Sequence, residues 1–496
     1  MPKLTRFDEI ISNYGHFVVR WRWLILLVSI LLAAAAITGT RHLEFKSDYR
    51  IWFSAENPQL QAFERLQRMY TKNDNILFVL APQGGDAFAP EVLAAVEDLT
   101  AEAWRLPYAI RVDSISNFQH TEAEQDDLVV ADLIEGGEHF DETETARVRD
   151  IALAEPALAD RLIADDTAVT AVSVTFQMPE LRADEVFETA TAARQLAQRI
   201  ENDYPLIDTY LTGVVMLNTA FPEAAIRDYT TLIPAMYGVI IVTLLLLVRS
   251  IAGMIGTVVL IALAAGSAFG LAGYAGIKLS PPAVSALTMI MTLSVADAVH
   301  LMMSMRSQMQ QGLDKTAALI ESLRINFGPI FLTSLTTAIG FASMNFADAP
   351  PFRDLGNITA TGVMIAFLLS VSFLPAFISI CPMKKSKATR MYSGLMNRLA
   401  DFVIDKRRIL LPVMALSSVA VLAFIPKNEL NDEFVKYFDE RIPFRTDTDF
   451  AVENLTGIYQ IQYSLDTGNS NGISDPEFLA QADAFTHWLR EQPETV

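Results

Sequence analysis

The stretch Pro281–Met303 reads PPAVSALTMIMTLSVADAVHLMM, and it decides the class of fold. It is long enough to cross the hydrocarbon core of a bilayer, because a membrane-spanning helix needs about 20 apolar residues. Its second half nevertheless contains Asp297 and His300. A charged group at membrane depth costs roughly 2.5–3.5 kcal/mol on insertion scales, so such residues mark functional sites. The segment therefore predicts a membrane helix with a polar site inside it.

Six further segments could span a bilayer in the same way. Of the seven, only Leu279–Met305 contains an Asp, Glu, His, Lys or Arg. The chain of 496 residues is 51% hydrophobic and 19% charged, with a mean hydropathy of +0.29, whereas soluble domains are about 25% charged. We therefore predict an α-helical polytopic membrane protein. Its spans are Trp23–Thr40, Leu232–Val248, Ser250–Ile277, Leu279–Met305, Phe327–Ala347, Leu355–Met383 and Ile409–Pro426.

Composition also argues against several functions. The net charge of −20 excludes a nucleic-acid partner, whose phosphates require a basic surface. One cysteine, Cys381, and six histidines without HxxxH or HExxH spacing predict no metal site. The sequence contains no Gly-rich phosphate loop and no nucleophile motif. We expect no cofactor and no enzyme activity.

The distribution of charge predicts the orientation. Basic residues gather in the short segments 1–22, 306–324 and 384–408, which indicates that these lie in the cytoplasm. Residues 41–230 hold 35 Asp and Glu against 15 Lys and Arg, so we expect an acidic domain outside. The expected parts are a cytoplasmic N-terminus (1–22), the first span (23–40), a periplasmic domain (41–230), five spans (231–383), a cytoplasmic linker (384–408), a seventh span (409–426) and an incomplete second periplasmic domain (427–496).

The acidic insert shows the periodicities of an α+β domain. Strands are expected at 75–81, 109–115, 167–178 and 207–212, with helices at 89–104 and 182–202. This order is typical of a ferredoxin-like unit, although another α+β fold remains an alternative. The acidic segment 119–166 is interpreted as a helical excursion.

An internal repeat appears when the chain is shifted by 385 residues, and such repeats are common in transporters. Phe17, Val18 and Arg22 then correspond to Phe402, Val403 and Arg407. The second copy ends at Val496, which corresponds to Arg111, so we predict a truncated second repeat and the N-terminal part of a longer chain. Residues 430–496 should consequently pack poorly, and Ile461, Tyr463 and Leu465 should lack a sheet.

Asp297 and His300 are the candidate site. Their i, i+3 spacing places them on one helical face, where they could relay a proton. The alternative is that Asp297 is a polar strut bonded to a neighbouring span. In FLTSLTTAIGF, the hydroxyls of Thr333, Thr336 and Thr337, with Ser334 between them, either support Asp297 or bond to their own helix.

The aromatic residues that follow the first span are candidates for substrate access. They lie where a hydrophobic substrate would leave the bilayer, or they are interfacial anchors. They are Phe45, Tyr49, Trp52 and Phe53.

Three motifs resemble those of the resistance–nodulation–division (RND) superfamily. SVADAVH is similar to its VDDAI-type string, TSLTTAIGFAS to its fifth span and FLPAF to its sixth, although Ala296 stands where many relatives have a first acid. The order of one span, an outside domain and five spans most resembles the lipid-handling branch: hopanoid and sterol transporters, mycobacterial large membrane proteins and Patched-like proteins with sterol-sensing domains.

The resemblance implies a transporter in the bacterial inner membrane, driven by protons through Asp297. It would move a sterol-, hopanoid- or fatty-acid-like substrate into the periplasm, in contact with membrane lipids. A periplasmic carrier protein and a homo-oligomer are the partners it suggests. Two alternatives stay open, a SecD/SecF-like accessory of protein translocation and a sterol- or lipid-sensing protein without transport.

Overall fold

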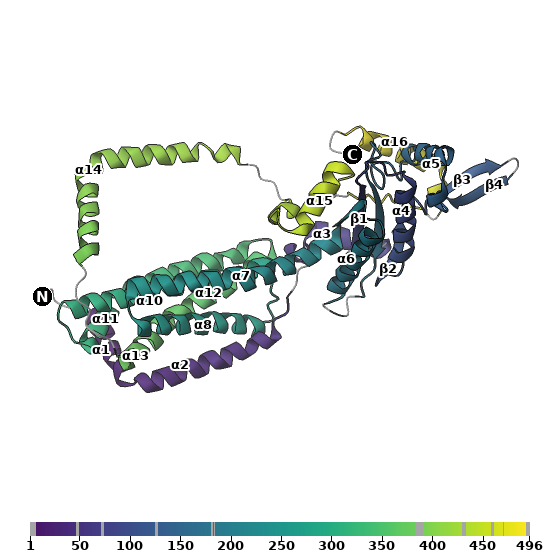
Figure 1. Ribbon diagram of the computed structural model, residues 1–496. Coiled ribbons are helices and arrows are strands. Elements are labelled where there is room, and N and C mark those ends of the chain that lie inside the picture. The colour runs from purple at the N-terminus through teal and green to yellow at the C-terminus, as the bar shows by residue number, and fades with distance from the viewer. Residues whose placement is uncertain are drawn as a thin grey trace. The chain divides into compact units, whose positions relative to one another are not determined.

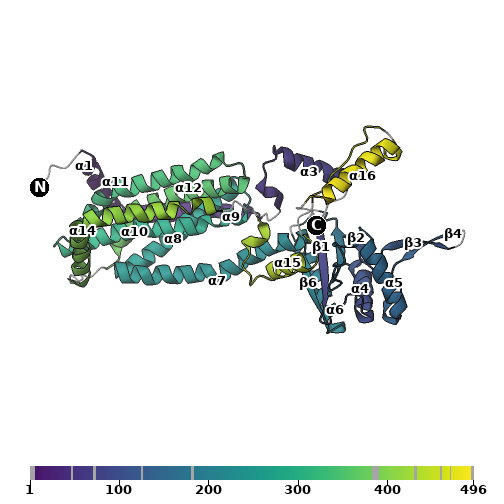
Figure 2. The same cartoon turned by 90° about the horizontal axis from the view of Figure 1, so that it is seen from above.

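The computed structural model describes residues 6–45, 49–70, 74–124, 127–179, 182, 184–382, 390–428, 433–457, 461–469 and 471–492. The chain divides into two compact units, each drawn in Figures 1 and 2. The membrane unit contains Met1–Lys46, Arg50–Ser54 and Arg227–Asp432. The α/β unit contains Ser47–Tyr49, Ala55–Ile226 and Glu433–Val496.

Helices make up the membrane unit. The α-helices are α1 (Arg6–Arg20), α2 (Arg22–Ile37), α7 (Val214–Val248, which begins in the α/β unit), α8 (Ile251–Tyr274), α9 (Pro281–Val284), α10 (Ala286–Gln310), α11 (Lys315–Ala342), α12 (Pro350–Val371), α13 (Phe373–Ile380) and α14 (Arg390–Leu422). Short 3₁₀ turns are η1 (Thr38–His42), η2 (Tyr49–Trp52), η4 (Ser343–Phe346) and η5 (Ile425–Lys427).

The seven expected spans are confirmed as helices of sufficient length and apolarity. Among the described residues these are Arg22–His42, Val214–Val248, Ile251–Tyr274, Pro281–Gln310, Lys315–Phe346, Pro350–Ile380 and Met396–Lys427. Several extend beyond the apolar core that predicted them, because a helix continues while its backbone hydrogen bonds are made, whatever the polarity of its side chains. The seventh span is one such case, since α14 begins at Arg390, within the expected cytoplasmic linker 384–408.

Three helices form the interior of the membrane unit. Of the apolar windows of α8, α10 and α12, 50%, 44% and 61% of the residues are buried, against 11% in α2 and α7 and none in α14. Their facing side chains, among them Leu260, Ile290 and Phe367, belong to one apolar cluster. The polar residues of α10 therefore lie within the best-packed part of the unit.

A close crossing of α2 and η1 with α8 depends on glycine. A Cβ atom built on Gly270 would lie 2.0 Å from the carbonyl oxygen of Ala36, and one built on Gly273 would lie 2.1 Å from that of Gly39. Small residues allow such close approach of membrane helices. The spacing of these helices, and with it the packing of their side chains, thus depends partly on glycines.

The α/β unit is built on a four-stranded antiparallel sheet. Its strands are β1 (Asp74–Pro82), β2 (Ala109–Asp113), β5 (Thr170–Phe176) and β6 (Ile207–Thr212), in the order β2-β5-β1-β6. Helix α4 (Pro90–Ala103) joins β1 to β2, and α6 (Glu185–Asp203) joins β5 to β6. The apolar cluster that covers the sheet includes Phe78, Phe88 and Phe176, all fully buried.

The interpretation of 119–166 as a helical excursion is only partly correct. This segment begins with an antiparallel hairpin of β3 (Gln119–Glu124) and β4 (Asp127–Asp132), followed by η3 (Gly137–His139) and α5 (Glu142–Ala154). The described residues of β4 are all exposed, so its sequence lacks the alternation of buried and exposed residues that predicts a strand. Helix α5 has the capping box of Asp141 and Glu144 that its sequence allows.

The prediction that residues 430–496 pack poorly is wrong for their first part. After η6 (Phe434–Tyr437), α15 (Pro443–Asn454) packs along β6 at the edge of the sheet. Phe444 and Ala451 join the same buried cluster as the sheet, and Tyr210 stacks on Phe450 with ring centres 3.8 Å apart. Apolar side chains of this segment thus complete the existing core and form no separate second domain.

The last part of the chain behaves differently. Ile461, Tyr463 and Leu465 are 78%, 55% and 47% exposed, and no strand is assigned within the described residues 461–469. After η7 (Gly472–Ser474), α16 (Pro476–Arg490) has no buried residue. Here the expectation of missing sheet partners agrees with the structure. Helix α3 (Pro58–Met69), capped by Asn57, completes the elements of this unit.

Candidate functional site

The site begins with the way in which α10 is started and oriented. Ser280 caps α9 by accepting a hydrogen bond from the Ala283 amide, and Ser285 separates α9 from α10. From there α10 crosses the centre of the membrane unit with Ile290, Ser294 and Asp297 on its buried side. Helical spacing thus places the carboxylate of Asp297 among packed helices, where it is only 7% exposed.

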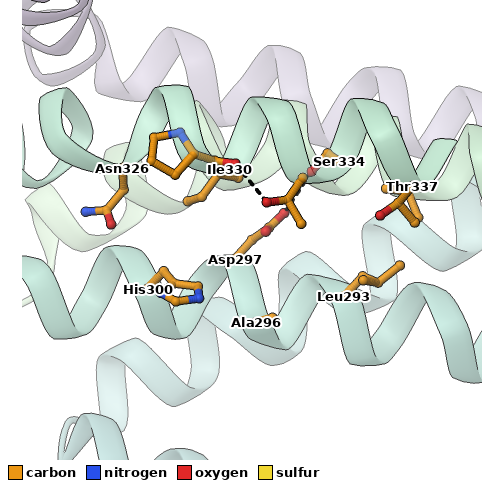
Figure 3. A pocket seen from close by; sticks show the side chains of 11 residues that line it. Leu293, Ala296, Asp297, His300, Asn326, Ile330, Ser334 and Thr337 are labelled. Atoms are coloured by element: carbon orange, nitrogen blue, oxygen red, sulfur yellow. Dashed lines mark hydrogen bonds between the residues drawn. The ribbon is translucent and has the colours of Figure 1, made fainter. Parts of the chain in front are cut away.

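The partner of this carboxylate is a hydroxyl on the neighbouring helix. Ser334, 3% exposed on α11, donates a hydrogen bond of 3.4 Å to Oδ2 of Asp297 (Figure 3). This distance is at the long end for an O–H···O bond, so the contact is weak in this arrangement. Asp297 is therefore oriented toward α11 and keeps acceptor capacity for other groups.

A cavity of about 110 Å³ adjoins the carboxylate. At roughly 30 Å³ per molecule, it has room for three or four water molecules. Figure 3 shows side chains of α10 and α11 on its opposite sides. The lining residues are Leu293, Ala296, Asp297, His300, Asn326, Pro329, Ile330, Thr333, Ser334, Thr337 and Val363.

The structure brings both residues of the expected relay to this cavity. His300 lies one turn after Asp297 on α10, on the same side of the helix (Figure 3). Its side chain is exposed, whereas that of Asp297 is buried. A buried carboxylate and a more accessible imidazole thus border the same cavity, which is an arrangement through which a proton can pass by way of water.

The hydroxyls of the fifth span divide between the two alternatives. Thr333 and Thr337 line the cavity, but Thr333 also donates to the carbonyl of Pro329 on its own helix. Thr336 is exposed, lies outside the cavity lining and donates to the carbonyls of Leu332 and Thr333. Thr336 is therefore not placed to support Asp297, because its position on the helix directs it away.

Sequence reasoning missed Asn326. Its side-chain amide donates to the carbonyl of Ser322 at 2.8 Å, and the Ser322 hydroxyl donates to the carbonyl of Leu301 on α10 at 2.6 Å. Asn326 precedes Ile330 and Ser334 by one and two helical turns, and all three line the cavity. The i, i+4, i+8 spacing of these lining residues was the available signal.

Two of the basic residues that predicted orientation bind the ends of other helices. Arg306 donates to the carbonyl of Val248 at 2.9 Å. Lys315 donates to the carbonyls of Ser379 and Cys381 at 2.8 Å and 2.5 Å. Helix C-termini leave such carbonyls unpaired and carry partial negative charge, so these cations stabilise the ends of α7 and α13.

Two of the access aromatics, Phe45 and Trp52, contact different parts of the membrane unit. Phe45 forms an isolated bridge with Leu279, and Trp52 packs edge-on against Phe352 with ring centres 5.8 Å apart. Phe45 and Phe53 are 38% and 43% exposed. The side chain of Tyr49 lies outside the described residues. Their role in substrate access stays a prediction.

The described residues contain no group of three or more His, Cys, Asp or Glu that could hold a metal ion.

A second cavity, of about 380 Å³, lies in the α/β unit between the segments 160–166 and 452–457. Asp160, Asp165, Asp166 and Glu453 line it. Burial and the neighbouring Asp165 raise the pKa of Asp160, as expected for acids placed close together.

The fold and the site together define a multi-pass membrane protein with a carboxylate in one of its spans, beside a small cavity that several polar side chains line. The model of the MMPL family matches residues 53–401, well over half of the chain. The chain therefore belongs to the MMPL family, a branch of the RND superfamily of membrane transporters, as its motifs indicated. A membrane protein of Methanocaldococcus jannaschii is 21% identical over 387 residues, which cover 75% of this chain and 94% of that protein.

Proposed function

We propose that this chain is a proton-driven transporter of a hydrophobic, lipid-like substrate of the sterol, hopanoid or fatty-acid class. The observation that carries the proposal is Asp297, a carboxylate buried among helices of the membrane unit and bordered by a cavity that His300, Asn326 and several hydroxyls also line. Placing an ionisable group at that depth is costly and is characteristic of proton and substrate pathways. Within the described part of the chain its hydrogen-bond partner is the neutral hydroxyl of Ser334, so a purely structural ion pair is a weaker explanation.

Proton movement would use the groups that border the cavity. Asp297 would exchange a proton with water in the cavity, and His300 would pass it toward the end of α10. Ser334 would hold the carboxylate toward α11 in its charged state. In this scheme Thr333 and Thr337 supply further hydroxyls at the cavity wall, whereas Thr336 has no part.

The orientation and the α/β unit complete the proposal. We place the N-terminus in the cytoplasm of a bacterial cell and the α/β unit in the periplasm, since basic residues gather in the short loops. The strand order and the two β-α-β connections support a ferredoxin-like assignment for that unit. Such a domain would receive the substrate from the inner membrane and pass it to a periplasmic carrier protein.

A second copy of the chain is the proposed partner within the membrane. His300 of α10 and Thr333 of α11 are exposed, although both also line the cavity beside Asp297. Polar groups at membrane depth are unfavourable against lipid, so another helical unit is expected to cover them.

The test is the substitution Asp297→Asn in the intact protein. Asparagine keeps the shape of the side chain and removes the titratable proton. In proteoliposomes that contain a pH-sensitive dye, movement of a fluorescent sterol or fatty-acid probe should accompany proton uptake, and Asp297→Asn should abolish both. Ser334→Ala should slow them several-fold, because it removes the hydroxyl that orients the carboxylate.

Thr336→Ala is the matched control, since it also removes one hydroxyl from α11 but lies outside the cavity lining. It should leave both rates unchanged. Persistent pH-dependent movement of the probe in Asp297→Asn would refute the relay. If the unchanged protein binds an unfolded peptide but does not move the lipid probe, a SecD/SecF-like function is favoured. If it binds the probe without any proton uptake, a lipid sensor is favoured.

A further inference from the structure

Helix α1, which precedes the first span, has three distinct faces. Ile11, Gly15 and Val18 follow the i, i+4, i+7 spacing of one helical side and are buried. The approach to α11 on this side is close, since a Cβ atom on Gly15 would lie 3.1 Å from the side chain of Ile320. This face is the one by which α1 packs on the membrane unit, beside α11 in Figures 1 and 2.

A second face is apolar and about half exposed. Phe7, Ile10 and Phe17 are 52%, 58% and 51% exposed. At 100° per residue these positions form a stripe adjacent to the buried one. Trp21, at 48% exposure, continues the stripe to the start of α2. A stripe of this kind marks a surface that contacts an apolar partner.

The third face is polar. Asn13, His16 and Arg20 are exposed on the side of the helix opposite the buried residues. Arg6 and Arg22 add positive charge at the two ends of the helix and its junction with α2. Basic residues beside an apolar stripe are typical of helices that lie in a membrane surface among anionic headgroups.

The position of α1 along the chain indicates which partner covers the apolar stripe. Only Trp21 separates α1 from α2, whose Trp23, Leu24 and Leu27 are also exposed. Because α2 is a membrane span, these side chains face hydrocarbon, and the stripe of α1 continues the same surface. The partner of the stripe is therefore the lipid leaflet at this end of the bundle.

An ion pair connects α1 to the helix that lines the Asp297 cavity. Arg324 of α11 binds Asp8 at 2.8 Å and Glu321 at 2.6 Å, and the side chains of Arg324 and Asp8 are each 24% exposed. Phe7 and Tyr14 also pack edge-on against Phe327, one turn further along α11. Both contacts lie on the same stretch of α11 as Asn326, which lines the cavity.

We infer that α1 is a membrane-surface helix whose Phe7–Ile10–Phe17 stripe inserts into the leaflet beside the N-terminus, and that the Asp8–Arg324 pair couples it to α11. Its position in the leaflet thereby restrains the helix that closes the cavity around Asp297. The insertion itself does not depend on the proposed transport, so the two can fail separately.

The first experiment maps the faces of α1 in bilayers. Single cysteines at Ile10 and Phe17, and at Asn13 and His16 as matched controls, are introduced into the full chain with Cys381→Ser and labelled with bimane. In vesicles of phosphatidylcholine and phosphatidylglycerol, lipids that carry a quencher below the headgroup should quench the first pair at least threefold more than the second. Aqueous iodide should show the opposite order.

Equal quenching of both pairs would overturn the inference. So would protection of Ile10 and Phe17 from both quenchers, since protein and not lipid would then cover the stripe.

The second experiment compares Asp8→Asn with Glu9→Gln, which removes a neighbouring carboxylate outside the pair. Amide exchange in α1 should rise about threefold in Asp8→Asn alone, as expected for loss of a partly exposed ion pair. Equal exchange in the two variants would refute the coupling to α11.

Discussion

Substitution of Gly270 by alanine should destabilise the crossing of α2 and α8. The added Cβ atom would lie 2.0 Å from the carbonyl oxygen of Ala36, whereas real Cβ atoms essentially never approach closer than 3.0 Å. The two helices must therefore separate by about 1.0 Å at this point, the difference between these two distances. The obstacle is backbone, so no side-chain rotation can relieve it.

The size of the effect follows from two opposing contributions. Overpacking of a well-packed interior costs about 1–3 kcal/mol, and a backbone obstacle places Gly270→Ala at the upper end. Replacing glycine in a helix gains about 0.5–1 kcal/mol. The expected net loss is about 2 kcal/mol in the free energy of unfolding of the membrane unit.

Gly238→Ala in α7 is the matched control, because a Cβ atom there meets nothing within 4 Å. It should retain the gain in helix propensity without the clash. Reversible unfolding in mixed micelles, followed by circular dichroism, measures both variants against the unchanged protein. If Gly270→Ala is as stable as Gly238→Ala, the close crossing does not exist in solution and the reasoning fails.

Three further predictions concern other parts of the molecule. Burial raises the pKa of Asp447, so folding favours its protonated form. The contribution of Asp447 to the stability of α15 on the sheet should be greatest below about pH 4 and should fall as the pH rises through the raised pKa. Asp447→Asn should remove this pH dependence in hydrogen-exchange measurements. Phe88→Ala should cost about 3–5 kcal/mol in chemical unfolding because Phe88 is fully buried, whereas Leu128→Ala, 75% exposed, should stay within about 0.5 kcal/mol; similar losses would contradict the described core. A reporter fused at Lys387 should be active in the cytoplasm and one at Asn454 in the periplasm, and the reverse would overturn the proposed orientation.

Much of the fold follows from local pattern. The seven spans were predictable because each must cover the thickness of a bilayer with apolar side chains, and each segment meets this requirement by its own sequence. The four strands of the sheet were located to within a few residues by alternating or continuous apolar runs, as in the strand at 207–212, whose bounds agree with β6. The hairpin β3–β4 was missed because the side chains of β4 are all exposed and carry no period of burial.

The candidate site was only partly visible in the sequence. Asp297 stands out because a carboxylate within an apolar segment is costly anywhere in the membrane, whatever its neighbours are. Which hydroxyl reaches it depends on the rotation of α11 against α10, and this selects Ser334 and excludes Thr336. The rotation is set by packing between helices, not by either segment alone.

The sequence by itself determined the class of protein, the number of candidate spans and the position of a carboxylate inside one of them, since these depend on the free energy of placing each segment in lipid or water. Only the tertiary structure decided that α15 completes the core of the first α/β unit. The contacts responsible, such as the pair of Thr212 and Thr448, join residues 236 positions apart. Apolar surface is buried wherever a complementary surface exists, and the distant partner that supplies it cannot be identified from the period of one segment.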